Sequence, residues 1–347
     1  MKVYTEGGYQ NVKERRNMQM TSVKQLTSDT MGTIYELTNE SGTIVRVSPE
    51  GARLLDWVIP IEEGRDIVAG YDSIQGHIDA RYYGATIGPV AGRIAGTRFV
   101  IDGTEYETED NDDGNTLHGG FKGLDTDTWL AETFEEANSA GVIFTTNRTD
   151  GTGGFPGNVR YQVTYTLSND HELSIAYDAV TDQATLFNPT NHGYFNLTGD
   201  TQQAIDGHLV QINAQHVAET NDDVTTTGEK TAVTGTKFDF TNEREIGDTI
   251  LDDPFLLDHD QAWDLQVTSP DQKVRLTVTT DRPAVVIYTT GTGEVGAAMK
   301  TGPMANHGAM AIETQGVPGT EKYSQFGDIS LRPDTPFHSV TTYRVHF

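Results

Sequence analysis

The sequence predicts an all-β protein built as a large β-sandwich, and three observations lead to this prediction. Many short runs are rich in Val, Ile, Thr, Tyr and Phe, and many of them alternate apolar with polar residues. Turn dipeptides such as Asp102-Gly103 and Asp150-Gly151 separate the runs. The 36 glycines fit a chain dense in turns, and convincing amphipathic helices are scarce. Many strands with few helices favour a sandwich, because a sheet must bury one face against another layer.

The expected strands begin shortly after Thr30 and continue almost to the end of the chain. In chain order they cover residues 33–38, 43–47, 54–59, 98–101, 141–146, 160–167, 172–178, 209–212, 273–279, 284–290 and 339–345. No repeat of fixed period and no Pro/Ser-rich linker divides them, so we expect a single domain over residues 26–347. Residues 1–25 are expected to form an N-terminal arm, either loose or docking late as a strand.

The composition narrows the classes of partner and chemistry. The 347 residues include 24 basic and 51 acidic ones, and the net charge of −27 disfavours nucleic acid and anionic membranes as partners. The absence of cysteine excludes disulfides, thiolate catalysis and Cys-ligated zinc. The segment from Met1 to Leu26 lacks an apolar signal core, and no stretch approaches the roughly 20 apolar residues of a membrane span. We therefore expect a soluble cytoplasmic protein.

The segment from Asn188 to Leu197 is the most informative part of the chain. As one extended strand it would place nearly all of its hydrogen-bonding side chains on one face, because side chains alternate with a period of two. That face would carry Asn188, Thr190, His192, Tyr194 and Asn196. Such a face suits the wall of a cleft for a hydroxylated ligand. An exposed face with one structural histidine is the alternative for an isolated strand.

A second segment supplies a partner for His192. The apolar run from Ala309 to Ile312 leads directly into Glu313. An imidazole and a carboxylate, each expected at a strand end, form a plausible acid/base pair. Burial beside the apolar run would raise the pKa of Glu313 toward neutrality.

Two further residues stand in settings that suit ligand binding. Arg93 lies among the small residues of segment 88–96, where a ligand could approach the five donors of the guanidinium. His118 precedes two glycines in Leu117-His118-Gly119-Gly120. The alternatives are a hairpin with a surface arginine and an ordinary turn histidine.

Other motifs do not support a function. Segment 291–296 matches GxGxxG after a strand, but no helix follows, so we interpret it as a turn. The Asp258-His259-Asp260 triplet lacks a second histidine at ligand spacing and is read as a solvated loop. A carboxylate pair for glycoside hydrolysis stays open, because 51 acidic residues allow many pairings.

Taken together, these segments resemble the aldose 1-epimerase (galactose mutarotase) family from about Thr30 to the C-terminus. The Thr-Asn-His-x-Tyr-Phe-Asn-Leu block that begins at Thr190 is the most specific match. The Leu-His-Gly-Gly block at Leu117, the Glu-Thr-Gln block at Glu313 and Tyr83-Gly84-Ala85 occur in the family order. The resemblance implies a large antiparallel β-sandwich, the galactose mutarotase-like supersandwich, with the sugar held on its concave face.

The resemblance also implies roles for individual residues. Glu313 would be the general base and His192 the general acid, whereas Arg93 and His118 would bind sugar hydroxyls. The family's substrate-binding aspartate aligns best with Asp252. Asp253 and Asp258 are the alternatives for that aspartate.

The chain departs from the family pattern at three positions. The family often has arginine where Pro89 stands, asparagine where Gly92 stands, and serine where Gly193 stands. The first two changes remove polar groups beside the sugar, so they bear on the choice of sugar and leave the acid/base pair intact.

The implied activity is interconversion of the α and β anomers of free aldohexoses such as galactose and glucose. One group removes the anomeric hydroxyl proton while another protonates the ring oxygen, and no cofactor, metal or covalent nucleophile is required. The expected partner is a monosaccharide, and the protein would be a monomer or a homodimer. A hexose-6-phosphate epimerase, a non-catalytic carbohydrate-binding protein and an accessory sandwich of a glycoside hydrolase or lyase are the competing interpretations.

Overall fold

The computed structural model describes residues 21–292 and 294–347. Most of the expected N-terminal arm, residues 1–20, lies outside the described part. Its last residues belong to strand β1, Ser22–Ser28, which pairs along its whole length with β2, Gly32–Thr38. The expected boundary between residues 25 and 26 therefore falls inside a strand.

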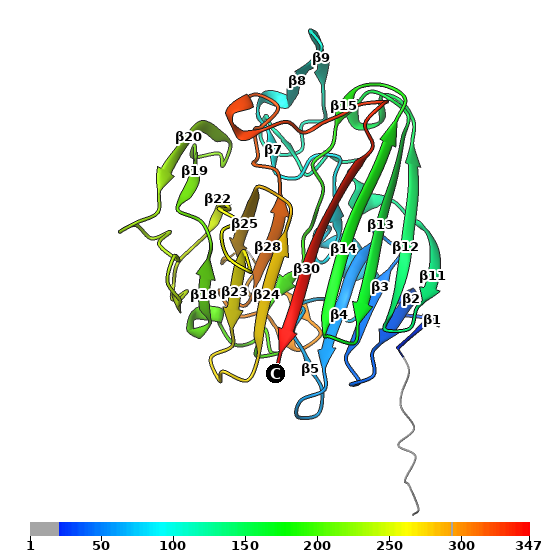
Figure 1. Cartoon of the computed structure of the whole chain (residues 1–347), viewed down its shortest axis with the longest axis vertical. Helices are drawn as coiled ribbons and strands as arrows, with labels where there is room; N and C mark the ends of the chain where they lie inside the picture. The colour runs from blue at the N-terminus through cyan, green and yellow to red at the C-terminus, as the bar shows by residue number, and fades with distance from the viewer. Residues whose placement is uncertain (1–20, 293) are drawn as a thin grey trace, which may run out of the picture.

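The described chain forms three large sheets, which confirms the predicted β-sandwich class (Figure 1). Neighbouring strands within each of these sheets are antiparallel. The largest has nine strands, which in spatial order are β11 (Leu130–Glu135), β12 (Ser139–Arg148), β13 (Val159–Ser168), β14 (Glu172–Thr181), β30 (Phe337–His346), β24 (Arg275–Thr280), β23 (Leu265–Thr268), β18 (Leu209–Ile212) and β21 (Arg244–Glu245).

The six-stranded sheet carries much of the candidate site. Its spatial order is β17 (Tyr194–Phe195), β28 (Met310–Gln315), β25 (Ala284–Thr289), β22 (Asp252–Leu256), β19 (His216–Thr220) and β20 (Thr226–Ala232). The five-stranded sheet consists of β1 and β2 followed by β3 (Ile44–Ser48), β4 (Arg53–Ile59) and β5 (Arg65–Asp66).

Short strand pairs and single helical turns connect the large sheets. The pairs are β6 (Thr86–Ile87) with β16 (Thr190–Asn191), β7 (Arg93–Ile94) with β10 (Thr116–Leu117), β8 (Arg98–Ile101) with β9 (Thr104–Glu107), β15 (Thr185–Leu186) with β29 (Ser330–Leu331), and β26 (Ala298–Met299) with β27 (Gly302–Pro303). The helices are α1 (Ile74–Asp79), η1 (Ala95–Thr97), η2 (Leu124–Thr126), η3 (Thr152–Gly154), η4 (Ile205–Gly207) and η5 (Ser324–Phe326). Among the described residues, the helices are too short and too polar to cross a membrane.

One continuous hydrophobic core joins the three large sheets. Strand β13 alternates buried and less buried residues, and it contributes Tyr161 and Val163 to the core cluster. The five-stranded sheet adds Trp57, and the six-stranded sheet adds Ile287 and Ile312 from one of its faces. Because side chains alternate along a strand, the other face of the six-stranded sheet is left to form the candidate site.

The prediction of one continuous strand over residues 188–197 is wrong. Thr190–Asn191 pairs with β6, whereas Tyr194–Phe195 pairs with Met310 and Ala311 of β28. The chain changes partner at His192, whose carbonyl oxygen accepts a hydrogen bond from the Gly84 amide at 2.9 Å. This change of partner places His192 at the junction between two sheets.

The polar residues of this segment are mostly structural, which corrects the prediction that they form a cleft wall. The Nδ2 group of Asn188 donates to the Gly316 carbonyl at 3.0 Å, and its Oδ1 accepts from the Gly316 amide at 2.6 Å. The Nδ2 group of Asn196 donates to three backbone carbonyls. Of the five side chains predicted to share the cleft wall, only His192 and Tyr194 line the cavity described below.

Candidate active site

A cavity of about 390 Å³ lies over the face of the six-stranded sheet that points away from the hydrophobic core. Its floor follows the strand register, because Glu313 of β28 is opposite Val286 of β25, and Val286 is opposite Pro254 of β22. Asp252 and Tyr288 form a second cross-strand pair in the same floor. The volume falls within the roughly 300–1,000 Å³ of typical small-molecule sites.

Strand β28 places Glu313 in the cavity by simple alternation. Met310 and Ile312 point into the hydrophobic core, so Glu313, between Ile312 and Thr314, points to the opposite side. Its side chain is buried, with 3% of the residue exposed. Glu313 lies within the strand, whereas the sequence suggested a position at the strand end.

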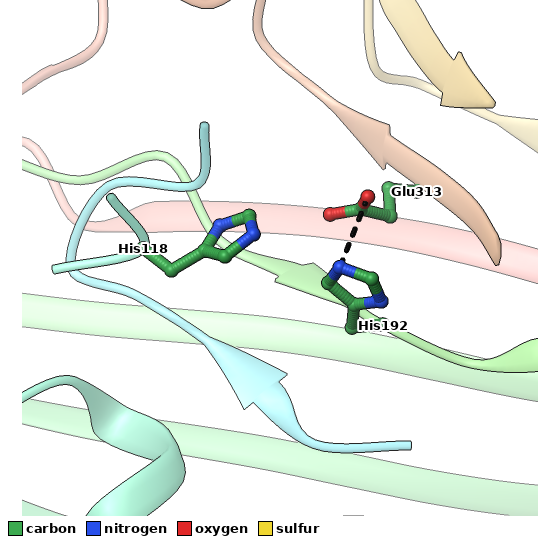
Figure 2. Close-up of side chains that lie close together, drawn as sticks. All are labelled: His118, His192 and Glu313. Carbon is green, nitrogen blue, oxygen red and sulfur yellow. Dashed lines mark ion pairs between the residues drawn. The ribbon is translucent and has the colours of Figure 1, made fainter. Parts of the chain in front are cut away.

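His192 and Glu313 both line this cavity and lie next to each other, and the dashed line in Figure 2 joins them. The Nε2 atom of His192 lies 3.4 Å from Oε1 of Glu313. The remaining polar atoms of the pair, Nδ1 of His192 and Oε2 of Glu313, are buried without a hydrogen-bond partner among the described residues. The two side chains therefore keep hydrogen-bonding capacity that a ligand could use.

His118 is the third buried side chain of the cluster in Figure 2. It follows β10 with a positive φ of 53° and is held by Gly92 in two ways. The Gly92 amide donates to His118 Nδ1 at 3.2 Å, and the His118 amide donates to the Gly92 carbonyl at 3.0 Å. The following Gly119 has no room for a side chain, since a Cβ there would lie 2.2 Å from the Gly88 carbonyl oxygen.

The donor set favours hydrogen bonding over metal binding. His118, His192 and Glu313 each have one potential ligand atom, and these three atoms lie within 4.8 Å of one another. A metal ion could bring atoms at this spacing into its coordination sphere. However, Nδ1 of His118 accepts the Gly92 N–H, so the proton of the neutral ring is on Nε2. A metal-ligating histidine instead donates its second nitrogen to an acceptor and offers a lone pair to the metal. His118 thus presents an N–H donor.

Arg93 and Asp252 form the charged wall of the cavity. The Arg93 Nε donates to Asp112 at 2.7 Å, and its Nη1 lies 3.6 Å from the Asp252 carboxylate. Asp253 and Asp258 are absent from the described lining of the cavity: Asp253 accepts the Asp252 amide, and Asp258 accepts the amide of Gln215. Among the three candidate aspartates, the geometry favours Asp252.

Burial controls the ionisation of the cluster. Burial raises the pKa of Glu313 well above its usual value, the nearby Asp252 carboxylate raises it further, and Arg93 lowers it. Burial lowers the pKa of His192 to about 3. Burial also lowers the pKa of His118, and positive charge on His192, Arg93 and Arg81 acts in the same direction. Burial therefore favours the neutral form of each of the three groups.

Aromatic rings and two further polar residues complete the cavity, and of these only Tyr194 was predicted from sequence to line a cleft. The Tyr82 ring stacks on His192 with centroids 5.8 Å apart, and the Tyr194 ring stacks on it at 4.9 Å. These rings account for part of the desolvation of His192. Glu294 and Gln315 also line the cavity. Gln315 belongs to the quoted Glu-Thr-Gln block, but no sequence signal distinguished it from core residues.

Comparison with known proteins agrees with the fold. The aldose 1-epimerase family model matches residues 33–344. The chain is 32% identical over 330 residues to an aldose 1-epimerase from Escherichia coli, covering 90% of this chain and 94% of that protein. It is 31% identical over 324 residues to a maltose epimerase from Levilactobacillus brevis, covering 89% and 94%.

Further relatives extend this result to animals and to solved structures. The chain is 34% identical over 292 residues to a galactose mutarotase from Homo sapiens, covering 80% of this chain and 83% of that protein. The crystal structure of an aldose epimerase homologue from C. elegans superimposes with a TM-score of 0.83 at 26% identity, covering 94% of this chain and 99% of that one. The chain therefore belongs to the aldose 1-epimerase family of carbohydrate isomerases.

Proposed function

We propose that the protein interconverts the α and β anomers of free aldohexoses such as galactose and glucose. The observation that carries this proposal is the buried pair of His192 and Glu313, 3.4 Å apart, in a cavity with donors and acceptors for hydroxyl groups. His118 supplies an N–H donor, Arg93 a guanidinium and Asp252 an acceptor. These three residues are proposed to bind the sugar hydroxyls.

The proposed reaction needs one acid and one base at the same time. Glu313 accepts the proton of the anomeric hydroxyl while His192 donates a proton to the ring oxygen, which breaks the C1–O5 bond and leaves the open-chain aldehyde. Rotation about C1–C2 presents the other carbonyl face. The 5-hydroxyl then returns its proton to His192 as it attacks C1, and Glu313 protonates the new anomeric oxygen.

The ionisation of the pair is compatible with these roles. A neutral Glu313 with a neutral His192 carries the same number of protons as a carboxylate with an imidazolium. Moving one proton from Glu313 to His192 converts the first form into the second. The reaction therefore needs no proton from outside the pair. General acid/base catalysis contributes typically about 10²–10⁴-fold for each group.

The charges in the cavity favour a neutral sugar over a sugar phosphate. Arg93 is the one Arg or Lys of the described lining, and it already contacts Asp112 and Asp252. The lining also contains three carboxyl groups, those of Asp252, Glu294 and Glu313. A phosphate dianion would meet net negative charge there, so hexose 6-phosphates are expected to be poor substrates.

The reducing end of a disaccharide is a second candidate substrate. One relative is named a maltose epimerase. The cavity of this chain continues past the acid/base pair to Tyr71, Tyr288 and Glu294, where a second sugar ring could stack on tyrosine. The proposal is tested by polarimetry with fresh α-anomers of galactose, glucose, maltose and glucose 6-phosphate, each with and without the protein. No acceleration with any of them, together with sugar binding in a calorimeter, would favour a non-catalytic carbohydrate-binding protein.

A further inference from the structure

Gln315 is a polar cavity residue to which the proposed reaction gives no role. It is the last residue of β28 and lies two positions after Glu313 on the same face of the strand. Its side chain lines the cavity, and the residue is fully buried, with 0% of its surface exposed.

Within the described part of the chain, the side-chain amide of Gln315 has no hydrogen-bond partner. Both Nε2 and Oε1 are buried and unpaired among the described residues. Because an unpaired buried amide costs free energy, such a group in a native protein indicates a missing partner. The nearby structural amides behave differently: Asn188 exchanges two hydrogen bonds with the backbone of Gly316, and Asn196 donates to three carbonyls.

The surroundings of Gln315 leave the partner to come from the cavity. A Cβ on Gly92 would lie 3.6 Å from Gln315 Nε2 and 2.8 Å from Cγ of Pro318. Gly92 therefore contributes only backbone atoms next to Gln315, and Pro318 occupies the space that a side chain at position 92 would need. The Thr226 hydroxyl also belongs to the cavity lining, and it already donates to the Pro318 carbonyl at 2.8 Å.

We infer that Gln315 binds a pair of ring hydroxyls of the sugar and helps to determine which aldose the protein accepts. This inference rests on the proposed function. An amide offers two N–H donors and one acceptor oxygen, which match two neighbouring hydroxyls that each donate and accept. Residues two positions apart on a strand are separated by about 6.8 Å. With Glu313 at the anomeric carbon, Gln315 would therefore contact the opposite side of the sugar ring. The hydroxyls on C3 and C4 lie on that side, and galactose differs from glucose at C4.

The test replaces Gln315 with leucine and measures kcat/KM with galactose, glucose, 3-deoxygalactose and 4-deoxygalactose. For galactose, Gln315→Leu is expected to lower kcat/KM by about 10–100-fold, because two hydrogen bonds to the sugar are lost. The ratio of galactose to the deoxy sugar that lacks the bound hydroxyl should fall to near one in the variant. The melting temperature should stay level or rise, because the variant removes an unpaired buried amide.

Thr314→Val is the matched control on the opposite face of the same strand. Thr314 Oγ1 lies 2.6 Å from Thr341 Oγ1 in the protein interior. This variant should lower the melting temperature and leave the galactose-to-deoxygalactose ratio unchanged.

Two results would overturn the inference while the proposed function stands. One is an active Gln315→Leu variant whose kcat/KM matches wild type for every sugar. The other is a variant that loses stability but keeps the wild-type ratio between galactose and both deoxy sugars, as a structural amide would. Gln315→Met, which preserves length, replaces the leucine variant if the latter does not fold. If wild type itself fails to accelerate any mutarotation, the proposed function fails, and Gln315 is then tested by calorimetric titration of wild type and variant with galactose, where equal affinity contradicts the inference.

Discussion

The pH dependence of catalysis follows from the burial of His192 and Glu313. The active pair holds one proton, so activity is lost when a second proton binds or when the first one leaves. The second proton must go to His192, whose pKa is lowered to about 3, so the acidic limb should lie far below neutrality. The single proton of the pair is lost when Glu313 ionises. Because the pKa of Glu313 is raised, the alkaline limb should lie well above that of a free carboxyl.

Ordinary pKa values predict a different profile. A pair with reference values of about 4.3 and 6.5 would be most active near pH 5.5, and only about one-tenth would hold a single proton at pH 7.5. The buried pair should instead keep its activity below pH 4, because the acidic limb is set by the His192 pKa of about 3.

Polarimetry of fresh α-D-glucose in weak, constant-strength buffers gives this profile after the spontaneous rate is subtracted. Asp252→Asn tests the direction of the Glu313 pKa shift. The Asp252 carboxylate raises that pKa, so its loss should move the alkaline limb to lower pH. A narrow optimum near pH 5.5 in wild type, or a shift of the alkaline limb to higher pH in Asp252→Asn, would contradict the perturbed pKa values of the pair.

Three other predictions concern binding and stability. Arg93→Leu should raise KM for galactose by about 10-fold or more with a smaller change in kcat, since a charge-assisted hydrogen bond contributes about 1.5–3 kcal/mol; an unchanged KM in steady-state assays would argue against its binding role. Glu313→Gln should be at least as stable as wild type above pH 7 in urea unfolding, because a group with a raised folded-state pKa loses its stabilising contribution as pH rises through that value; a variant less stable at pH 8 would contradict this sign. Gly92→Asn should cost about 1–3 kcal/mol in the same experiment, since its Cβ would lie 2.8 Å from Cγ of Pro318, and Pro318→Gly in the same chain should recover part of the loss; equal stability of Gly92→Asn and wild type would show that Pro318 yields easily.

Strand patterns predicted much of the fold because alternation is a local property. The strands at Arg98–Ile101 and Leu209–Ile212 have the predicted ends, and the predicted strand 141–146 extends to Ser139–Arg148. Strand β22 was not predicted, because Asp252, Asp253 and Pro254 all disfavour strands. Its place between β25 and β19 is set by tertiary pairing.

The candidate site was predictable only where its residues belong to a specific motif. His192 and Glu313 lie where the sequence motifs suggested an acid/base pair, but the sheet change at His192 could not be seen in a segment whose composition suits a single strand. The unpaired amide of Gln315 was equally invisible, because a missing hydrogen bond is a property of three-dimensional neighbours. The competition between Asp252, Asp253 and Asp258 likewise depends on side-chain direction, which spacing alone does not define.

The most direct test of the account is polarimetry of freshly dissolved α-D-galactose with wild type, Glu313→Gln and a control, Glu321→Gln. Glu321 is a suitable control because burial raises its pKa to about 7 and its Oε2 has no partner among the described residues, yet it is absent from the described cavity lining. We expect rapid equilibration with wild type and with Glu321→Gln, and a rate about 10²–10⁴-fold lower with Glu313→Gln. Near-normal turnover in Glu313→Gln would contradict the assignment of Glu313 as the base.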